Sequence, residues 1–337
     1  MILFIGNFLT AHGYNPTFLE ILGNELSEKY DIELVSSKKN KLFRLYDMFK
    51  YYIINLKKIK LLIIDTYSSN AFYYALLLAF FSILMNKKYI LVLSGGGLGR
   101  RLDNSFLFNI ILRKSYLNIS PSKYLYKKFI NYNIEYIPNY IDLEKYHFKK
   151  RKNLAPNLLW VRSLHEIYNP KMAVLVLKSL IKTYPKATLC LVGPAKDESL
   201  NEIQRLIKKY DLVKSIIVTG RLNKRDWIKL SIDYDIFINT TNYDNHPVSV
   251  IEVMALGLPV VTTNVGGIPY FLKNNETAKL VGKNDVVGMV LAIDEYINDS
   301  FNSIEIAMNA RKLVSREYSK EIIFNKWCSI IDNLILS

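Results

Sequence analysis

Cysteine is scarce in this sequence, which has only Cys190 and Cys328 among its 337 residues. The two lie far apart in apolar or amphipathic surroundings, without the paired spacing of zinc ligands or of a disulfide framework. Low-complexity tracts are also absent and half of the residues are hydrophobic, so we expect a large packed core and little disorder. These features favour a reducing cytoplasm and argue against a small secreted disulfide-rich protein. Because the cysteines lack the spacing of zinc ligands, we also predict no metal site.

A hydrophobic run long enough to span a membrane is missing as well. The most apolar stretch, Ala71–Met85, is shorter than the roughly 18 to 20 residues that cross a bilayer, and we interpret it as a helix buried against a sheet. Met1–Gly6 lacks the basic start of a signal peptide, so we predict a first β-strand there. The expected location is the cytoplasm, either free or peripherally attached to the inner face of the cell membrane.

Acidic residues are scarce in one part of the chain. The whole sequence has a net charge of +15, and the stretch Met48–Ile134 alone has thirteen Lys or Arg against two Asp, a net charge of +11. This stretch overlaps the aromatic segment Phe43–Tyr52, and a basic helix with aromatic residues is typical of an anionic membrane surface as the partner. A solvated basic face explains the same pattern, and both interpretations stay open. No recognition motif for nucleic acid accompanies the charge, so we predict no nucleic-acid partner.

Short apolar runs alternate with helical patterns along the chain, which predicts an α/β fold with parallel sheets flanked by helices. The first series of predicted strands comprises 2–6, 32–35, 61–65, 89–93 and 117–119, and the second comprises 158–161, 187–192, 215–218, 235–239 and 259–262. A turn-prone, highly charged stretch separates the two series. We therefore predict two Rossmann-like domains, 1–143 and 156–319, that face each other across a cleft. They are joined by a linker at 144–155, and a last helix at 320–337 could cross back to the first domain.

The most informative segment is Asn242–Gly267, which predicts half of a βαβ unit. Pro247 suits the first position of a helix, and Gly257 suits its end. The run 258–262 then has the pattern of a short buried strand. Ligands bind beyond the carboxyl ends of strands in open α/β sheets, so the loops of this segment are candidates for a site.

Two carboxylates flank the start of this helix. Asp244 precedes it and Glu252 lies on its second turn. The first backbone amides of the helix, at Val248 and Ser249, favour an anion such as phosphate. We therefore expect one carboxylate to face a sugar and the other to bind a ribose.

Basic residues and glycine turns follow the other strands of the second domain. Arg162 and Lys171 come after its first strand, where they could stabilise the negative charge of a departing pyrophosphate without a metal. Gly193 and Gly220 lie in turns after the next two strands and could bring the backbone close to a nucleotide, although glycines are more often needed for turn geometry alone.

The first domain has its own loop candidates. His12 follows its first strand and is a candidate base or acceptor ligand, but a single loop histidine is more often structural or exposed. Gly95, Gly96 and Arg100 follow its fourth strand, where glycines allow close backbone approach and the arginine could meet a phosphate. The glycine run lacks a trustworthy dinucleotide fingerprint, so we interpret it as an acceptor-side loop.

The segment from Asp244 to Gly267 resembles the signature of the retaining GT-B glycosyltransferases of family four. Asp244 stands where that family has its first Glu, and Glu252 matches the second. The residues that follow in register are Ala255, Gly257, Pro259, Val260, Val261, Gly266 and Gly267. Arg162 and Lys171 resemble the family's diphosphate-binding pair, and 137–142 is similar to its interdomain run. The resemblance covers almost the whole second domain and the linker.

This resemblance implies two facing Rossmann-like domains and the transfer of a sugar from a nucleotide-diphosphate donor, with retention of the anomeric configuration and without a metal or other cofactor. It assigns Glu252 to the ribose hydroxyls, Asp244 to the donor sugar, and Arg162 with Lys171 to the diphosphate. Val248 and Ser249 would offer backbone amides to the sugar or phosphate. The acceptor would be a glycan or a polyprenyl-linked glycan of the bacterial cell surface.

Several positions depart from the family pattern. Asp244 is one methylene shorter than the usual Glu. Asn245-His246 replaces the usual Gly-Phe, so Asn245 and His246 could contact the sugar or acceptor themselves. Lys171 lies further from Arg162 than the family's lysine does, and Tyr168 is nearer the expected place. A GT-B protein that binds a nucleotide sugar without transferring it is the alternative function.

Overall fold

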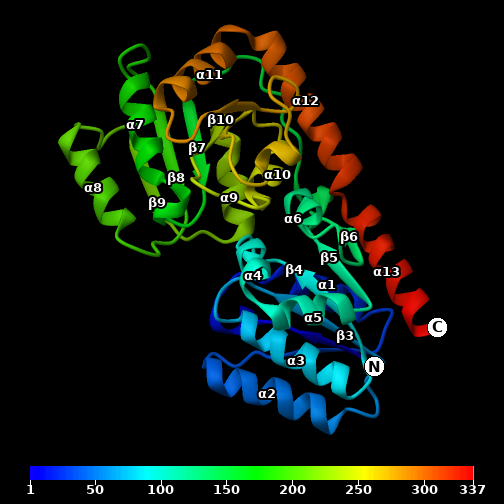
Figure 1. Ribbon diagram of the computed structural model, residues 1–337. Helices are drawn as coiled ribbons and strands as arrows, with labels where there is room; N and C mark the ends of the chain where they lie inside the picture. The colour runs from blue at the N-terminus through cyan, green and yellow to red at the C-terminus, as the bar shows by residue number, and fades with distance from the viewer. Residues whose placement is uncertain (337) are drawn as a thin grey trace. The chain divides into compact units, whose positions relative to one another are not determined.

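The computed structural model describes residues 1–336 and divides them into two compact units (Figure 1). Unit one consists of Met1–Asn139 together with the residues from Glu321 onward, and unit two is Tyr140–Lys320. Each unit has its own parallel sheet and its own hydrophobic core. The predicted α/β fold with two parallel sheets is thereby confirmed, while the predicted cleft between the units stays a prediction.

The sheet of unit one has the strand order β2-β1-β3-β4-β5-β6, and all neighbours are parallel. Its strands are β1 (Ile2–Ile5), β2 (Ile32–Val35), β3 (Leu61–Thr66), β4 (Lys88–Leu93), β5 (Leu117–Ser120) and β6 (Ile134–Tyr136). The five predicted strands are confirmed to within two residues at either end. β6 was not predicted; it is a three-residue edge strand whose side chains alternate between half-buried and exposed.

Helices cover both faces of this sheet. They are α1 (Phe18–Leu26), α2 (Lys41–Ile54), α3 (Phe72–Leu84), α4 (Leu98–Asn104), α5 (Phe106–Lys114), α6 (Lys123–Lys128) and α13 (Lys320–Leu336), with a short 3-10 helix at Thr10–His12. The core on one face joins buried residues of α2, α3, α5 and α6 to alternate residues of β1, β3 and β4. Asn40 and Ser105 cap α2 and α5 by accepting hydrogen bonds from backbone amides of the first turn.

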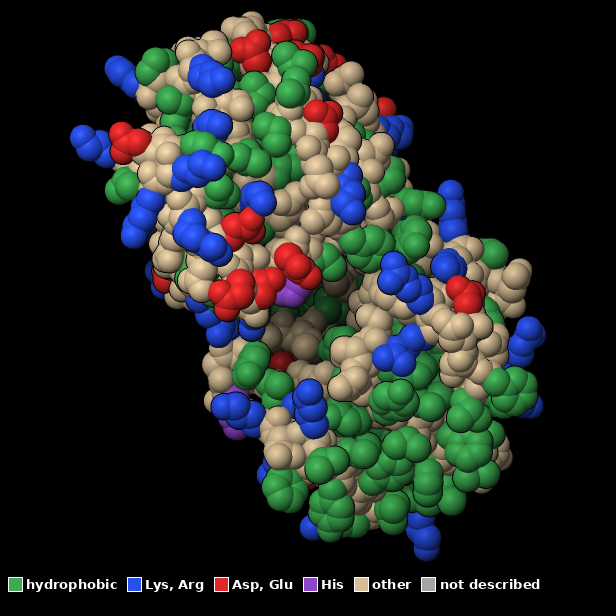
Figure 2. Space-filling view, turned by 60° about the vertical axis from the view of Figure 1, so that its left-hand side comes forward, with side chains coloured by type: hydrophobic (Ala, Val, Ile, Leu, Met, Phe, Trp, Pro, Cys, Tyr) green, Lys and Arg blue, Asp and Glu red, His purple; other side chains and the backbone are tan. Residues whose placement is uncertain are grey.

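Helix α3 corrects the prediction that Ala71–Met85 is buried. One side of α3 packs into the core, with Phe72, Ala75 and Leu78 inaccessible to solvent, but Leu77 and Leu84 on the other side are exposed. Hydrophobicity all around a helix usually signals burial on all sides, which is why the sequence alone was misleading. Figure 2 shows hydrophobic side chains gathered on this part of the surface. No helix among residues 1–336 is both long and apolar enough to cross a membrane.

The sheet of unit two has the strand order β12-β11-β10-β7-β8-β9, again all parallel. Its strands are β7 (Asn157–Val161), β8 (Thr188–Val192), β9 (Ile216–Gly220), β10 (Ile236–Asn239), β11 (Val260–Thr263) and β12 (Lys279–Val281). All five predicted strands are present, and β12 was missed. From β7 the chain continues to β8 and β9 on one side of β7, and then to β10 on the other side of β7. β7 and β10 therefore form the topological switch point of this unit.

The helices of unit two are α7 (Pro170–Leu180), α8 (Ser199–Lys209), α9 (Lys224–Leu230), α10 (Val248–Ala255), α11 (Val286–Asn298) and α12 (Ser300–Glu317). Short 3-10 helices lie at Leu143–Lys145, Glu166–Tyr168, Ser231–Asp233 and Ile268–Tyr270. Asn169 begins α7 and accepts a hydrogen bond from the Met172 amide, with Pro170 in the first turn.

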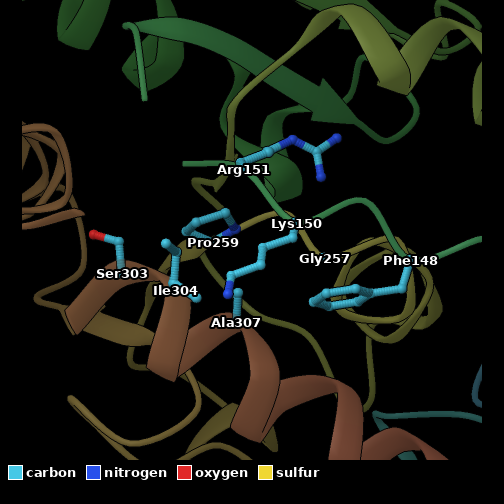
Figure 3. A pocket seen from close by; sticks show the side chains of 8 residues that line it. All are labelled: Phe148, Lys150, Arg151, Gly257, Pro259, Ser303, Ile304 and Ala307. Carbon is cyan, nitrogen blue, oxygen red and sulfur yellow. The ribbon is translucent and has the colours of Figure 1, made fainter. Parts of the chain in front are cut away.

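The stretch 144–155, expected to be a linker, packs against unit two. Arg151 is buried and donates hydrogen bonds to the carbonyl oxygens of Tyr234 and Leu256, the second of which lies at the end of α10. Burial lowers the pKa of Arg151 to about 10. Figure 3 shows the narrow crevice beside it, where the Phe148 ring lies next to Gly257 and the Arg151 guanidinium points away. Arg151 therefore ties this stretch to the end of α10.

Candidate active site

The switch point of unit two brings together two loops that are distant in the sequence. β7 and β10 are hydrogen-bonded neighbours, with Leu158 opposite Ile236. Arg162 directly follows β7, and the segment 240–247 follows β10. Parallel strands end at the same edge of a sheet, so the side chains of both loops meet there. The pairing of Arg162 with Asp244 is the direct result.

Arg162 forms an ion pair with Asp244 through Nη2 and Oδ2. Its guanidinium lies over the Tyr168 ring at 4.5 Å from the centroid, a cation–π arrangement. Burial lowers the pKa of Arg162, and its Nε has no hydrogen-bond partner among the described residues. An arginine still has donors to offer in this arrangement, because its side chain carries five N–H groups.

The loop that carries Asp244 is held by two glycines. The amide of Gly267 donates a hydrogen bond of 2.8 Å to the Asp244 carbonyl oxygen. A side chain at Gly266, which has φ of +57°, would overlap that carbonyl, and one at Gly267 would overlap the carbonyl of Asn245. The Asp244 carboxylate in turn accepts a hydrogen bond from the His246 amide at 3.1 Å. The glycine pair therefore serves the geometry of this loop.

Helix α10 begins beside the same loop. Pro247 precedes the helix instead of occupying its first position, a small correction to the prediction, and Val248 is the first helical residue. The amides of a first turn have no partner within the helix. The Ser249 hydroxyl is buried and has no hydrogen-bond partner among the described residues. Buried polar groups are normally satisfied, so this hydroxyl marks a place where a polar ligand fits.

Glu252 lies on the second turn of α10 and is buried. Its Oε1 accepts a hydrogen bond of 2.8 Å from the Tyr146 hydroxyl and lies 2.6 Å from Nζ of Lys224 at the start of α9. Burial and the neighbouring carboxylate raise the pKa of Tyr146 well above its ordinary value, so the hydroxyl remains a donor. Both interactions use Oε1 of the carboxylate.

Lys171 does not join Arg162. It is the second residue of α7, half-exposed, and its Nζ lies 2.7 Å from Oε1 of Glu202 on α8. The structure therefore does not bring the two cations of the expected arginine–lysine clamp together, and the diphosphate role of Lys171 stays a prediction. Tyr168 occupies the place beside the guanidinium.

The remaining predicted donor-side residues have varied surroundings. The ring of His246 contacts Phe271 and Tyr318, with centroid distances of 4.9 and 5.3 Å. Gly193 has φ of +151°, and a side chain there would overlap the Arg162 carbonyl. Gly220 has φ of +69° and open space around it. Gly193 therefore positions the backbone of Arg162, whereas Gly220 leaves room at the end of β9.

The predicted acceptor-side residues all lie in unit one. His12 is exposed and its Nε2 lies 2.9 Å from the Ser37 carbonyl oxygen. The backbone of Gly95 packs so closely on Ser68 that a side chain would overlap it, and Gly96 adjoins it in the same loop. Arg100 is exposed on α4. This close packing against Ser68 is a sufficient reason for a glycine at position 95.

Three residues beside these sites were not predicted from the sequence. Tyr146 stands in a stretch that its charge and turns marked as a linker, and Lys224 is one of many lysines. Asp65 is the second-last residue of β3 in unit one and is buried, and its carboxylate accepts hydrogen bonds from the hydroxyls of Ser94 and Tyr67. The one available signal was an acid at the end of an apolar strand. Among residues 1–336, no three His, Cys, Asp or Glu side chains gather as a metal site.

Comparison with known proteins gives a family for this arrangement. The family model for "Glycosyl transferases group 1" matches residues 142–313, half of the chain, including Arg162, Asp244 and Glu252. An uncharacterized glycosyltransferase of Haemophilus influenzae is 26% identical over 340 residues, covering 97% of this chain and 94% of that one. The capsular polysaccharide biosynthesis glycosyltransferase CapM of Staphylococcus aureus is 31% identical over 110 residues, covering 33% of this chain and 29% of that one.

The fold is shared with solved structures over the full length. The Anabaena protein Alr3699/HepE, solved in complex with UDP-glucose, has a TM-score of 0.75 and 16% sequence identity, with 98% of this chain and 99% of that chain covered. The two parallel sheets and this likeness confirm the GT-B fold that the resemblance implied. The chain belongs to the glycosyl transferases group 1 family.

Proposed function

We propose that this glycosyltransferase moves a sugar from a nucleotide-diphosphate donor to a glycan or lipid-linked acceptor in the synthesis of a bacterial cell-surface polysaccharide. The observation that carries the proposal is the meeting of Arg162, Asp244 and the start of α10 at one edge of the unit-two sheet. A cation, a carboxylate and helix amides are the groups that a sugar diphosphate requires. The CapM relative supports the polysaccharide context.

Each donor group has a proposed partner in unit two. Glu252 binds the ribose hydroxyls, with Tyr146 holding its carboxylate in place. Arg162 and the first amides of α10, together with the Ser249 hydroxyl, bind the diphosphate. Asp244 binds hydroxyls of the donor sugar, which requires its ion pair with Arg162 to loosen as the donor enters. Asn245 and His246 adjoin the sugar from the same loop.

The proposed reaction retains the anomeric configuration and uses no metal. The bond between the anomeric carbon and the diphosphate oxygen breaks, and the acceptor hydroxyl oxygen forms its bond on the same face of the sugar. The acceptor proton passes to the departing phosphate oxygen. Negative charge develops on the diphosphate during this step, so Arg162 and the α10 amides stabilise the transition state more than the ground state.

A panel of nucleotide sugars, followed by thermal shift and by hydrolysis, tests the proposal. One donor should raise the melting temperature and be hydrolysed, also with a chelator present. NMR of the transfer product should show the anomeric configuration of the donor. Absence of both binding and hydrolysis across the panel would reject the proposed activity, and an inverted product would reject retention.

Two substitutions separate the proposed roles. Glu252→Ala should weaken donor binding by about 10- to 150-fold, the equivalent of about 1.5 to 3 kcal/mol for hydrogen bonds to a charged group. Asp244→Asn should mainly lower turnover, because it keeps the shape of the loop and removes the charge beside the sugar. Equal donor affinity in Glu252→Ala and wild type would remove Glu252 from the site.

A second candidate function is donor binding without transfer. It is favoured by the ion pair that neutralises Arg162 and Asp244 and by the tyrosine at the expected place of a lysine. In that case the protein would bind a nucleotide sugar tightly yet yield neither hydrolysis nor product with any acceptor. Turnover of one donor, even slow, would decide for the enzyme.

A further inference from the structure

The surface of unit one carries large apolar side chains on three helices, α2, α3 and α5. They include Phe43 and Ile54 on α2, Leu77, Phe80 and Leu84 on α3, and Phe106 on α5, all exposed. We call this surface the apolar helix face, and Figure 2 shows it as the largest gathering of hydrophobic side chains on the visible side of the molecule. Soluble proteins seldom expose a large contiguous apolar area without a partner for it.

The three helices lie side by side. The rings of Phe49 on α2 and Phe81 on α3 are in edge contact with centroids 5.2 Å apart. Phe72 of α3 and Phe108 of α5 are in a similar contact at 5.0 Å. The order α2, α3, α5 is also visible in Figure 1. The three helices are therefore neighbours, in agreement with the gathering of hydrophobic side chains in Figure 2.

Helix α3 is the most unusual part of this face. None of its residues from Phe72 to Leu84 is charged. Tyr73, Leu77, Phe80 and Leu84 recur at spacings of three and four residues and are all exposed. A surface helix normally presents charged or polar groups at such positions. Exposure of this side of α3 to water is therefore energetically unfavourable.

Exposed cations lie on two of these helices, and acids are nearly absent from all three. Lys41 and Lys50 lie on α2 and are exposed, and Arg113 and Lys114 end α5, also exposed. The only acid in the three helices is Asp47, half-buried, which accepts a hydrogen bond from the Ser36 hydroxyl. The excess positive charge of residues 48–134 thus borders a surface that is apolar at its centre.

We propose that the apolar helix face docks on a membrane leaflet that contains anionic lipids. Its apolar side chains would enter the boundary between headgroups and acyl chains, while lysines and arginines contact lipid phosphates, with the helices lying along the surface. A second copy of this chain fits less well, because a two-fold interface would bring the same cations together without acids to neutralise them. Docking there does not depend on the sugar-transfer activity.

Co-sedimentation of the full chain with vesicles, without any nucleotide sugar, tests the proposal. Vesicles of phosphatidylcholine mixed with phosphatidylglycerol should bind the protein, and vesicles of phosphatidylcholine alone should bind it at least about tenfold more weakly, since each cation near an anionic surface contributes about 1 kcal/mol. Added salt should weaken the binding of the wild-type protein. Salt-insensitive binding, or equal binding to both vesicles, would overturn the charge component.

A triple variant tests the apolar component. Phe43→Ser, Ile54→Ser and Leu84→Ser together should lower the vesicle partition coefficient at least about tenfold, because three large apolar side chains are lost. The matched control is Val287→Ser, Leu291→Ser and Phe301→Ser in unit two, where Val287 and Ile54 have the same exposed fraction of 69%. The control should bind within about twofold of wild type, as expected for surface substitutions that do not touch the lipid.

Self-association is the outcome that would replace the proposal. Light scattering that shows a dimer in wild type and a monomer in the triple variant, together with no binding to phosphatidylglycerol vesicles, would identify the face as a contact between copies. Equal losses in the triple variant and its control would also overturn docking through this face. Hydrolysis of the donor in vesicle-free buffer is measured separately, so failure of docking does not bear on the proposed transfer.

Discussion

The switch points of the two units occupy the same place in similar sheets but differ in charge. In unit two, the residues after β7 and β10 are Arg162 and the Asp244 loop, and the opposite charges pair. In unit one the equivalent neighbours are β1 and β3. Asp65 is the second-last residue of β3 there, close to Gly6 after β1. No cation is paired with Asp65 among the described residues.

This difference has an electrostatic consequence. Burial raises the pKa of Asp65 to about 6, although the hydroxyls of Ser94 and Tyr67 oppose the shift. The carboxyl is therefore left unneutralised, although unit one is rich in cations. The comparison indicates that topology provides the position for a site, whereas the residues at the strand ends decide whether it suits an anion.

Removing the cation at the unit-two switch point should have the largest effect. Arg162→Gln keeps donors near Asp244 but removes the charge that faces the departing diphosphate. We expect turnover to fall by about 10² to 10³, the loss seen when one preorganised donor to a developing oxyanion is removed. Steady-state kinetics with the donor found in the panel measures this effect, and the melting temperature reports folding.

The matched control for Arg162 is Lys178, a cation of the same unit that lies over an aromatic ring, Tyr210, at 4.0 Å from its centroid. Lys178→Gln should leave turnover within about twofold of wild type, as for most surface substitutions. If both variants lost activity equally, the special position of Arg162 at the strand end would be refuted.

Asp65, the carboxyl at the unit-one switch point, should affect how the free energy of unfolding depends on pH. The raised pKa means that the folded state favours the protonated form of Asp65. The resulting contribution to the free energy of unfolding is fully present below about pH 4 and is lost as the pH rises through about 6. The shift corresponds to about 3 kcal/mol between these limits. Asp65→Asn, which cannot ionise, should therefore lose less stability than wild type as the pH rises from 4 to 7.

Denaturant unfolding across this pH range, followed by circular dichroism, measures the difference. Asp103→Asn is the control, because Asp103 is an exposed acid of the same unit with a salt bridge of 3.7 Å to Lys128. Its pH dependence should follow that of wild type. Parallel curves for wild type and Asp65→Asn would show that Asp65 is ionised over the whole range, and the contrast between the two switch points would disappear.

Sequence patterns predicted most of the fold because the strands of a parallel sheet are buried on both faces and are therefore continuous apolar runs. Ten strands were found in this way. β6 and β12 escaped because each has only three residues, and Lys279 in β12 breaks the apolar pattern. The exposed side of α3 could not be foreseen, because an apolar sequence does not reveal that a face has no partner within the chain.

The site was predictable where local sequence determines it. Asp244 and Glu252 lie around one helix start, as spacing alone required. Tyr146 and Lys224 could not be found in this way, since both reach Glu252 from distant segments and only the packing of 144–155 and α9 brings them there. The position of Lys171 was not predictable for the opposite reason: it is near Arg162 in sequence, but after the turn at 166–169 it pairs with Glu202 on α8.

The hydroxyl of Tyr146 offers a smaller test of how unit two holds its carboxylates. Tyr146→Phe removes one hydrogen bond to Glu252, worth about 1 kcal/mol, and should raise the donor KM about fivefold with little change in kcat. The control is Tyr184→Phe, which removes a similar bond of 2.5 Å to Asp294 away from the site. An equal change in both variants, or a fall in kcat alone, would contradict a positioning role for Tyr146.

The smallest expected effect belongs to Lys171. If proximity in sequence governed the diphosphate site, Lys171→Ala would lower turnover nearly as much as Arg162→Gln. The structure instead joins Lys171 to Glu202 in an exposed ion pair, which contributes about 0 to 1 kcal/mol to stability and nothing to a ligand at the end of β7. We expect kcat and the donor KM of Lys171→Ala to stay within about twofold of wild type, as for Glu202→Ala. A large loss in Lys171→Ala alone would mean that α7 rearranges when the donor binds, and the contrast between a cation at the strand end and one on a neighbouring helix would no longer hold.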